Sequence, residues 1–448
     1  MNLAIRGRLA IYFDSNLKLH IIKDPLVLVE GNSILDIDSF SKLKKEISNH
    51  DIIGDENQLI IPGLINCHTH LAMTLFRGLA DDLPLDIWLR KHIWPLEDKL
   101  QANDVYVGAK LGAIESLLAG VTTLNSMYWY PSSEAQAFEE TGLRGMIGAP
   151  VITGIAELPE AIEVIEKHHN TIQDRLRVSL SLHSPYTVTI PDFQGANDYL
   201  KEYNESQVDK PKILLHTHLA ESENEIEQSQ KLHKEHGIEF PEVSTPTELL
   251  ESTGILSEYL LAAHCIHVNE NDIKILEKNK VRVSLNPLSN AKLGNFMPPV
   301  PKIITDISSV GLGTDGPASN NTLDLFDTIR FLALYYKGFL HNPTLIKAQE
   351  VFQLATIGGA RALNWRGIGT LEPGSLADII TINLKKPHLT PKNLDDSILN
   401  HFAYAMNGND VENVVVDGKV VVKENEILRL DVDQSINEVE EATNRLLS

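Results

Sequence analysis

Short runs of β-branched and other apolar residues alternate with segments whose apolar residues recur at helical spacing. The apolar runs predict strands at 60–68, 121–127, 144–151, 177–183, 212–218, 260–264, 281–286 and 310–315. Helices are expected between them, among others at 104–119, 159–172, 223–236 and 271–278. This alternation predicts an α/β fold in which eight parallel strands close into a TIM-like (β/α)8 barrel. An open, doubly wound sheet is the alternative, but it usually has a glycine-rich turn after its first strand, where this chain has Asn66, Cys67 and His68.

The two ends of the chain have a different pattern. Residues 1–57 contain short apolar runs separated by turn residues, and residues 374–448 contain further short strands with Asp417-Gly418 as a hairpin turn. We therefore expect a small β-sandwich domain built from residues 1–57 and 374–448. The catalytic barrel, residues 58–373, would be inserted between these two segments.

The amino-acid composition disfavours some kinds of binding partner. The chain has 61 acidic and 39 basic residues, a formal charge of −22 that disfavours nucleic-acid and membrane partners. No apolar run approaches the ~18 residues of a membrane helix, and the N-terminus lacks a cleavable signal pattern. Cys67 and Cys265 are too few for a disulfide framework, which fits a reducing compartment. We expect a cytoplasmic protein that acts on a small molecule.

Histidines at predicted strand ends indicate the chemistry. His68 and His70 lie one residue apart, so both imidazoles point to one face at the carboxyl end of a buried strand. His218 and Asp315 stand at the ends of two other strands. A single histidine there could be an ordinary polar residue near a loop. Three histidines and one carboxylate around an open position are typical of a catalytic divalent metal site.

His216 lies on the same strand face as His218 and is the alternative ligand. We favour His218 because Glu221 follows it within one turn and brings a carboxylate beside the metal. His216 would lie deeper in the barrel, where we expect it to support a ligand or to pack. Apart from Glu221, the acidic run 221–227 is expected to be a solvated helix start. The other helical histidines are expected to be solvated too: His168, His169, His233 and His236.

Five segments resemble the metal-dependent amidohydrolase superfamily, and within it the 5-methylthioadenosine/S-adenosylhomocysteine deaminase branch. They are PGLINCHTHLAMTLFRGLADDLPLDIWLRKHIWPLE, HTHLAESENE, AAHCIHV, NPLSNAKLG and GLGTDGPASNN. The HTH motif is similar to the superfamily as a whole, whereas ADDLPL…IWPLE and TDGPASNN resemble the deaminase branch. Triazine hydrolases and guanine-type deaminases share much of this pattern. The resemblance extends from about residue 60 to residue 378.

The resemblance implies a role for each matching residue. Glu221 would be the acid/base that acts on the ring nitrogen, and His264 would direct the attacking water. Glu97 would hold the ribose hydroxyls, and Arg144 and His183 would also contact the substrate, together with Glu221 and Asp315. The implied metal ligands are His68, His70, His218 and Asp315.

The resemblance also implies one divalent ion per chain, most often Zn²⁺, with Fe²⁺ or Mn²⁺ as alternatives. Binuclear relatives carry a carboxylated lysine at the end of the fourth strand, and residues 177–183 contain none. The same absence disfavours hydrolysis of a cyclic amide. A non-catalytic barrel is disfavoured because all four ligands and Glu221 are present.

The implied reaction is hydrolytic deamination of an adenosine-type nucleoside, namely 5′-methylthioadenosine, S-adenosylhomocysteine or adenosine, to the inosine derivative and ammonia. A guanine-type deaminase or a triazine-type hydrolase is the alternative, and a homo-oligomer is expected. One departure concerns the second strand. The branch has an acidic residue before Met-Tyr, whereas this chain reads Asn125-Ser126-Met127-Tyr128. Asparagine is isosteric with aspartate and could keep a hydrogen bond there.

Overall fold

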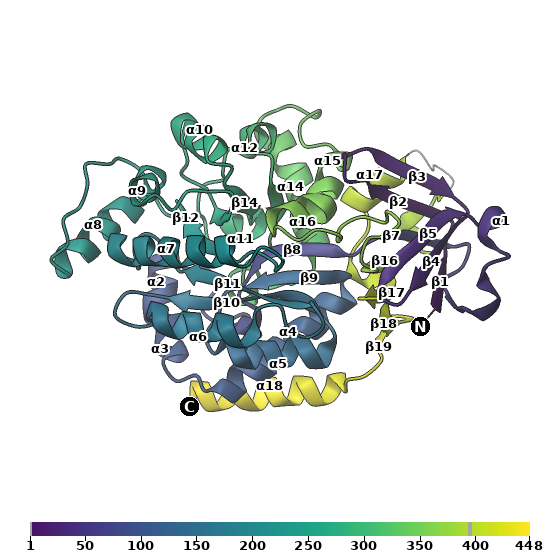
Figure 1. The fold of residues 1–448 in the computed structure, drawn as a ribbon, viewed down its shortest axis with the longest axis horizontal. Coiled ribbons are helices and arrows are strands. Elements are labelled where there is room, and N and C mark those ends of the chain that lie inside the picture. The colour runs from purple at the N-terminus through teal and green to yellow at the C-terminus, as the bar shows by residue number, and fades with distance from the viewer. Residues whose placement is uncertain (1, 393–396) are drawn as a thin grey trace.

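The computed structural model describes residues 2–392 and 397–448. Eight parallel strands form a closed barrel, which confirms the predicted (β/α)8 fold (Figure 1). The strands follow one another around the barrel in chain order, and the last pairs with the first. They are β8 (Leu64–Thr69), β9 (Val121–Ser126), β10 (Arg144–Val151), β11 (Leu176–Leu182), β12 (Leu214–Leu219), β13 (Leu260–His264), β14 (Arg282–Leu285) and β15 (Val310–Leu312).

Helices cover the outside of the barrel (Figure 1). Those between strands are α4 (Ala102–Leu118), α5 (Pro131–Thr141), α6 (Leu158–His168), α7 (Ile190–Ser206), α8 (Glu225–Glu235), α9 (Pro246–Thr253), α10 (Glu270–Lys278), α11 (Pro287–Lys292) and α12 (Val300–Asp306). After β15 come α13 (Pro317–Asn320), α14 (Leu325–Phe339), α15 (Ala348–Gln353), η4 (Leu354–Gly358) and α16 (Gly359–Ala362). Between β8 and α4 lie the short turns η2 (Leu71–Phe76), α2 (Leu85–Trp88), η3 (Leu89–Ile93) and α3 (Trp94–Glu97).

The small domain contains two sheets, and one of them joins both ends of the chain. The four-stranded sheet has the order β5-β4-β1-β6, and the seven-stranded sheet has the order β19-β18-β17-β16-β7-β2-β3. The N-terminal elements are β1 (Asn2–Arg6), β2 (Leu9–Phe13), β3 (Leu19–Lys23), β4 (Pro25–Glu30), β5 (Ser33–Ser39), α1 (Phe40–Leu43), η1 (Ile47–Asn49), β6 (Asp51–Ile53) and β7 (Gln58–Pro62). The C-terminal ones are β16 (Ile379–Asn383), η5 (Pro387–Leu389), α17 (Ile398–Tyr404), η7 (Gly408–Asp410), β17 (Val411–Val416), β18 (Lys419–Lys423) and β19 (Glu426–Ile427).

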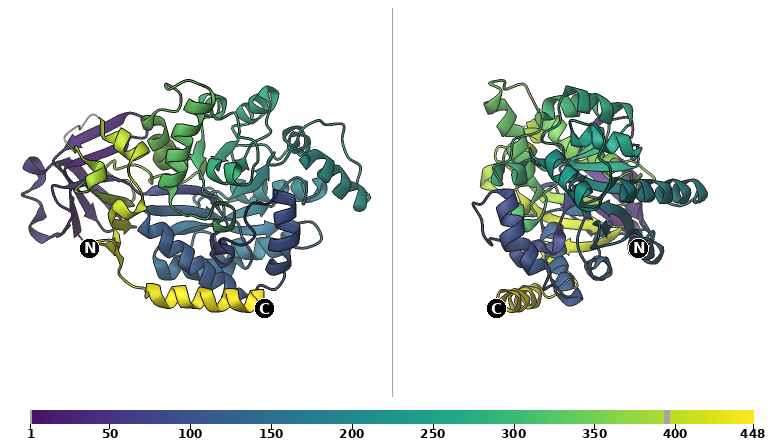
Figure 2. Two further views of the ribbon diagram at one scale, coloured as in Figure 1. Left: turned by 180° about the vertical axis from the view of Figure 1, so that it is seen from behind. Right: turned by 90° about the vertical axis from the view of Figure 1, so that its left-hand side faces the viewer.

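The domain boundaries differ from the predicted ones at two places. The predicted strand 60–68 is two strands, because β7 pairs with β16 in the small domain and the chain enters the barrel only after Gly63. A side chain at Gly63 would collide with Thr122, whose Oγ1 lies 2.0 Å from the position of a Cβ. The last helix, α18 (Val432–Leu447), packs along α4 of the barrel and not in the small domain (Figure 2). Ion pairs join them, Lys110 with Glu438 and Asp104 with Arg445.

A large apolar core fills the space between the barrel strands and their helices, whereas the inside of the barrel holds buried polar residues near its carboxyl end. Asn66, Asn125, Ser179 and His216 are all fully buried there. A buried polar group is stable only when it is hydrogen-bonded, so this interior is a network and not a packed apolar plug. Within the described residues, no helix combines the length and apolar character needed to cross a lipid bilayer.

Candidate active site

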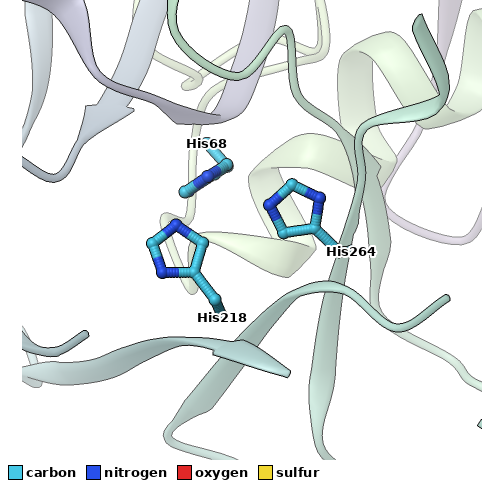
Figure 3. A group of neighbouring side chains, drawn as sticks. All are labelled: His68, His218 and His264. Carbon is cyan, nitrogen blue, oxygen red and sulfur yellow. The ribbon is translucent and has the colours of Figure 1, made fainter. Parts of the chain in front are cut away.

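Four predicted ligands converge at the carboxyl end of the barrel. His70 Nε2 lies 3.3 Å from Asp315 Oδ1, and His68 Nε2 lies 3.5 Å from the same oxygen. His218 Nε2 lies 3.4 Å from His70 Nε2. Ligand atoms about 2.1 Å from a tetrahedral zinc ion are about 3.4 Å apart, so these spacings match one shared ion. Figure 3 shows the rings of His68, His218 and His264 turned toward one another.

Main-chain carbonyl groups orient two of the histidines. His70 Nδ1 lies 2.5 Å from the carbonyl oxygen of Met127, and His218 Nδ1 lies 2.6 Å from that of His183. Since a carbonyl only accepts, each Nδ1 must donate, and each Nε2 keeps a lone pair directed into the site. This is the usual way in which a protein fixes the tautomer of a metal-binding histidine.

The short helix α11 contacts Asp315 and His264 through two of its side chains. Ser289 donates to Asp315 Oδ2 over 2.6 Å, and the amide of Gly316 donates to Oδ1 over 2.8 Å. Asn290 Oδ1 lies 2.9 Å from His264 Nδ1. Asp315 and His264 both have positive φ, 63° and 71°, a strained conformation for residues with side chains and one that is concentrated at functional sites. Sequence analysis missed Ser289 and Asn290, although both lie in the quoted segment NPLSNAKLG.

The electrostatics of the cluster suit a cation. Burial lowers the pKa of His68 to about 4 and that of His218 well below its ordinary value, so both rings are neutral. Burial would raise the pKa of Asp315, but the nearby rings of His68 and His70 hold it well below its ordinary range. His68 Nε2 is buried and has no hydrogen-bond partner. Against the effect of burial, Asp315 raises the pKa of His70 to about 8, so a cation bound here would replace the proton of that ring. Two neutral imidazoles, one carboxylate and an unsatisfied buried nitrogen fit a divalent metal ion.

Glu221 faces this cluster from the end of β12. Its Oε1 lies 3.9 Å from His264 Nε2, and its side chain is almost fully buried. Burial raises the pKa of Glu221, which favours the protonated form that an acid catalyst needs. Glu225 supports the loop: its two carboxylate oxygens accept the amide hydrogens of Ala220 and Glu221 over 3.1 and 2.9 Å. The prediction that Glu225 belongs to a solvated run is therefore wrong.

Two of the predicted substrate residues lie beside the histidine cluster. Burial raises the pKa of Glu97, and the neighbouring side chains of Tyr128 and Trp129 and the charge of His70 oppose that rise. The His183 ring is 4.9 Å from the His218 ring, and its Nδ1 lies 2.8 Å from Thr187 Oγ1. Glu97 and His183 therefore lie close to the histidines His70 and His218.

Arg144 does not lie in this site. It begins β10 at the amino end of the barrel, opposite the metal ligands. Its fully buried guanidinium donates to Asp378 through Nε over 2.6 Å and to Asp417 through Nη2 over 2.9 Å. Both carboxylates belong to the small domain. The prediction that Arg144 contacts substrate is wrong, because this side chain ties the barrel to the small domain.

His233 and His169 also differ from the sequence-based expectation. His233 is fully buried, donates through Nδ1 to the carbonyl of Ser229 and accepts the amide hydrogen of Ile190 at Nε2. His169 accepts the amide hydrogen of Val178 and lies 3.0 Å from the carbonyl oxygen of Pro211. Both histidines are structural contacts between a helix and its neighbours.

The chain is similar in sequence to proteins of known function. The profile of the amidohydrolase family matches residues 59–421. The chain belongs to this family. Among its amidohydrolase relatives, a 5′-deoxyadenosine deaminase of Methanothermobacter thermautotrophicus is 40% identical over 422 residues, 93% of each protein. A 5-methylthioadenosine/S-adenosylhomocysteine deaminase of Caldanaerobacter subterraneus is 38% identical over 431 residues, 94% of each.

Solved structures agree on the fold. The crystal structure of an adenosine deaminase from Xanthomonas campestris with bound zinc superposes with a TM-score of 0.88. The superposition covers 99% of this chain and 98% of that one, at 26% sequence identity. The amidohydrolase resemblance predicted from the sequence is confirmed, and the curated relatives named here are deaminases of adenosine-type nucleosides.

Proposed function

We propose that this protein is a metal-dependent deaminase that hydrolyses the amino group of an adenosine-type nucleoside. The observation that carries the proposal is the position of Glu221, a buried carboxyl whose pKa is raised, facing the three histidines and Asp315. One face of a bound purine ring would meet the ligand cluster, and its ring nitrogen would meet Glu221.

The metal would be held by four side chains, and zinc is the ion we propose, as in the Xanthomonas adenosine deaminase. When bound, a divalent ion acidifies water and stabilises negative charge that develops on oxygen. The donor set also suits other divalent ions, so metal analysis decides the identity. The proposed ligands are His68, His70, His218 and Asp315.

The proposed proton transfers use groups whose surroundings suit them. Asp315 Oδ1 faces the site and can accept the proton of the attacking water, while Ser289 occupies Oδ2. Protonated Glu221 can donate to the ring nitrogen next to the amino-bearing carbon, which makes that carbon electrophilic. His264, held at Nδ1 by Asn290, directs the water through Nε2. Water adds to the carbon, a proton reaches the amine, and ammonia leaves with formation of the inosine derivative.

We propose that Glu97 accepts hydrogen bonds from the ribose hydroxyls and that His183 contacts the purine. A pocket that binds hydroxyl groups rejects ligands that lack them, because its buried polar groups are then left unpaired. This would separate nucleosides from guanine and triazines, the substrates of the alternative functions. The names of the relatives add 5′-deoxyadenosine to the candidates methylthioadenosine, S-adenosylhomocysteine and adenosine.

An ammonia-release screen tests the proposal. We expect turnover with adenosine, 5′-deoxyadenosine, methylthioadenosine or S-adenosylhomocysteine, and far less with adenine, guanine or a triazine. The same sample should contain about one divalent ion per chain by elemental analysis. Turnover of guanine or a triazine above that of every nucleoside would contradict the proposal. Sedimentation of this sample would also test the predicted homo-oligomer.

A further inference from the structure

The last residue of α11, Lys292, ties this helix to two other segments of the chain. Its Nζ donates to the carbonyl oxygen of Ala318 over 3.0 Å and to Asn321 Oδ1 over 2.6 Å. It also donates over 2.7 Å to Asp81 Oδ1, which lies between η2 and α2. An ammonium group has three hydrogens to donate. The three contacts therefore use the whole donor capacity of Lys292, and every acceptor lies outside α11.

Asp81 closes these contacts into a ring. Its Oδ1 accepts from Lys292, and its Oδ2 accepts from Asn321 Nδ2 over 2.9 Å. Ala80 and Asp82, on either side of it, have left-handed φ values of 55° and 62°. This conformation is costly for a residue with a side chain and persists where surrounding contacts hold it. The side chains of Lys292 and Asp81 are only 25% and 29% exposed, so the ring is largely shielded from solvent.

α11 is attached at two points to the segment 315–321, which contains the metal ligand and α13. Ser289 donates to Asp315 Oδ2 over 2.6 Å at the start of this segment. Lys292 holds Ala318 and Asn321 further along it. Ser289 and Lys292 are three residues apart on α11, so their side chains lie on one face of the helix. The second attachment therefore fixes the helix at the position where the Ser289 hydroxyl meets the carboxylate.

We propose that Lys292 is a positioning residue, which sets the contact of Ser289 with the metal ligand Asp315. An ordinary exposed ion pair would have little effect of this kind. Lys302 and Asp306 form such a pair, 2.8 Å apart and one turn from each other on α12. That pair joins two residues of the same helix, whereas Lys292 joins α11 to two other segments. Lys302 is therefore a matched control.

This inference rests on the metal site of the proposed function but not on its substrate. Lys292→Met keeps most of the length of the side chain and removes all three donated hydrogens. Groups that orient a metal-binding side chain usually change metal affinity when they are removed, and we expect Lys292→Met to bind zinc or cobalt(II) about 10-fold more weakly. Competition with a chelator measures the affinity. Lys302→Met should bind both ions as the wild type does.

A double variant tests whether Lys292 acts through Ser289. If it does, its loss should matter little once the Ser289 hydroxyl is already absent. In the Ser289→Ala protein, Lys292→Met should therefore change metal affinity by no more than about twofold. Two independent effects would instead multiply, so a full 10-fold loss in both backgrounds would overturn the inference. Wild-type metal affinity in the single variant Lys292→Met would also overturn it.

The melting temperature of each metal-free variant shows whether it is folded. If Lys292→Met does not fold, Asn321→Gly carries the test, because glycine adopts the φ of 68° at this position without strain. This change removes the acceptor for Lys292 and the donor to Asp81. It should weaken metal binding in the wild-type background but not in Ser289→Ala, and equal losses in the two would overturn the inference. A protein that shows the expected metal affinities but deaminates no nucleoside would refute only the substrate assignment.

Discussion

The Ser289 hydroxyl donates to Asp315 Oδ2 across 2.6 Å, and this contact leaves Oδ1 as the oxygen that faces His68 and His70. Ser289→Ala removes the donor without removing a ligand. We expect metal affinity to fall about 10-fold and kcat/KM to fall with it, since outer hydrogen bonds orient metal-binding carboxylates. Chelator competition and steady-state kinetics at saturating metal measure the two effects separately. Unchanged affinity would mean that Gly316 alone orients the carboxylate.

Glu221 has a matched control in its own loop. Glu221→Gln keeps the shape but cannot donate a proton from a carboxyl group, so kcat should fall about 100-fold or more with metal content unchanged. Glu223→Gln changes an exposed carboxylate two residues away and should leave kcat unaffected. Stopped-time ammonia assays and elemental analysis of the same samples check this. Loss of metal in Glu221→Gln would make this residue a ligand, and normal turnover would exclude it from the mechanism.

Glu97 can be tested with substrate analogues as well as by mutation. If it accepts both ribose hydroxyls, 2′-deoxyadenosine and 3′-deoxyadenosine should each lose at least about 10-fold in kcat/KM relative to adenosine. Glu97→Ala should remove most of this discrimination while the metal stays bound. The ratio of kcat/KM between adenosine and each analogue is the measurement. Equal values in the wild-type enzyme would show that Glu97 does not bind the ribose.

Arg144 should affect stability and not catalysis. Arg144→Met leaves Asp378 and Asp417 buried without their partner, which typically costs about 3–5 kcal/mol of unfolding free energy. Arg366→Met, at an exposed position, is the control and should cost almost nothing. Denaturant unfolding gives both values. The folded fraction of Arg144→Met should keep the wild-type kcat/KM, and a selective rise in KM would place Arg144 at the substrate after all.

The buried carboxyl group of Glu134 should make the free energy of unfolding depend on pH. It is fully buried, Ser126 donates to its Oε1 over 2.6 Å, and its Oε2 has no partner. Burial raises the pKa of Glu134 to about 7. Because the folded state then holds a proton that the unfolded state has lost, this residue lowers stability as pH rises from about 4.5 to about 7, by about 3 kcal/mol in total.

Glu134→Gln removes this titration. The difference in unfolding free energy, Glu134→Gln minus wild type, should increase as pH rises through this range and then stay constant. The variant therefore gains stability relative to the wild type. Glu139→Gln, an exposed neighbour on α5, should follow the wild-type curve. Denaturation series between pH 5 and pH 8 supply the comparison. Parallel curves for the wild type and Glu134→Gln would show that Glu134 is ionised in the folded protein throughout.

Local patterns were sufficient to predict the barrel and to place the proposed ligands at strand ends, because both depend on short-range rules. Alternation along a strand places His68 with His70 and His216 with His218, and the ligands do lie at strand ends. The same rules could not place Arg144, since its partners Asp378 and Asp417 are more than two hundred residues away in sequence. A basic residue at a strand start has the same sequence pattern whether it binds a substrate or a distant carboxylate.

The sequence also could not predict which residues orient the side chains of the site. Ser289, Asn290 and Glu225 belong to short polar segments whose composition is typical of exposed loops. Their roles depend on which neighbouring strand end the loop covers. The split of the first predicted strand at Gly63 depends likewise on contact with Thr122, which lies on a different strand.

The pairing of β7 with β16 constrains the order in which the protein can assemble during synthesis. Ile61 of β7 pairs with Ile380 of β16, so all eight barrel strands are made before this partner leaves the ribosome. The amide of Gly63 donates to the carbonyl of Asp378 over 2.9 Å, next to the point where the barrel closes. If the barrel closes first, Gly63 and Asp378 are already close together. The pairing of β7 with β16 then has to close a much shorter loop. A nascent or truncated chain that ends before residue 379 would expose the apolar edge of β7, and we expect it to aggregate.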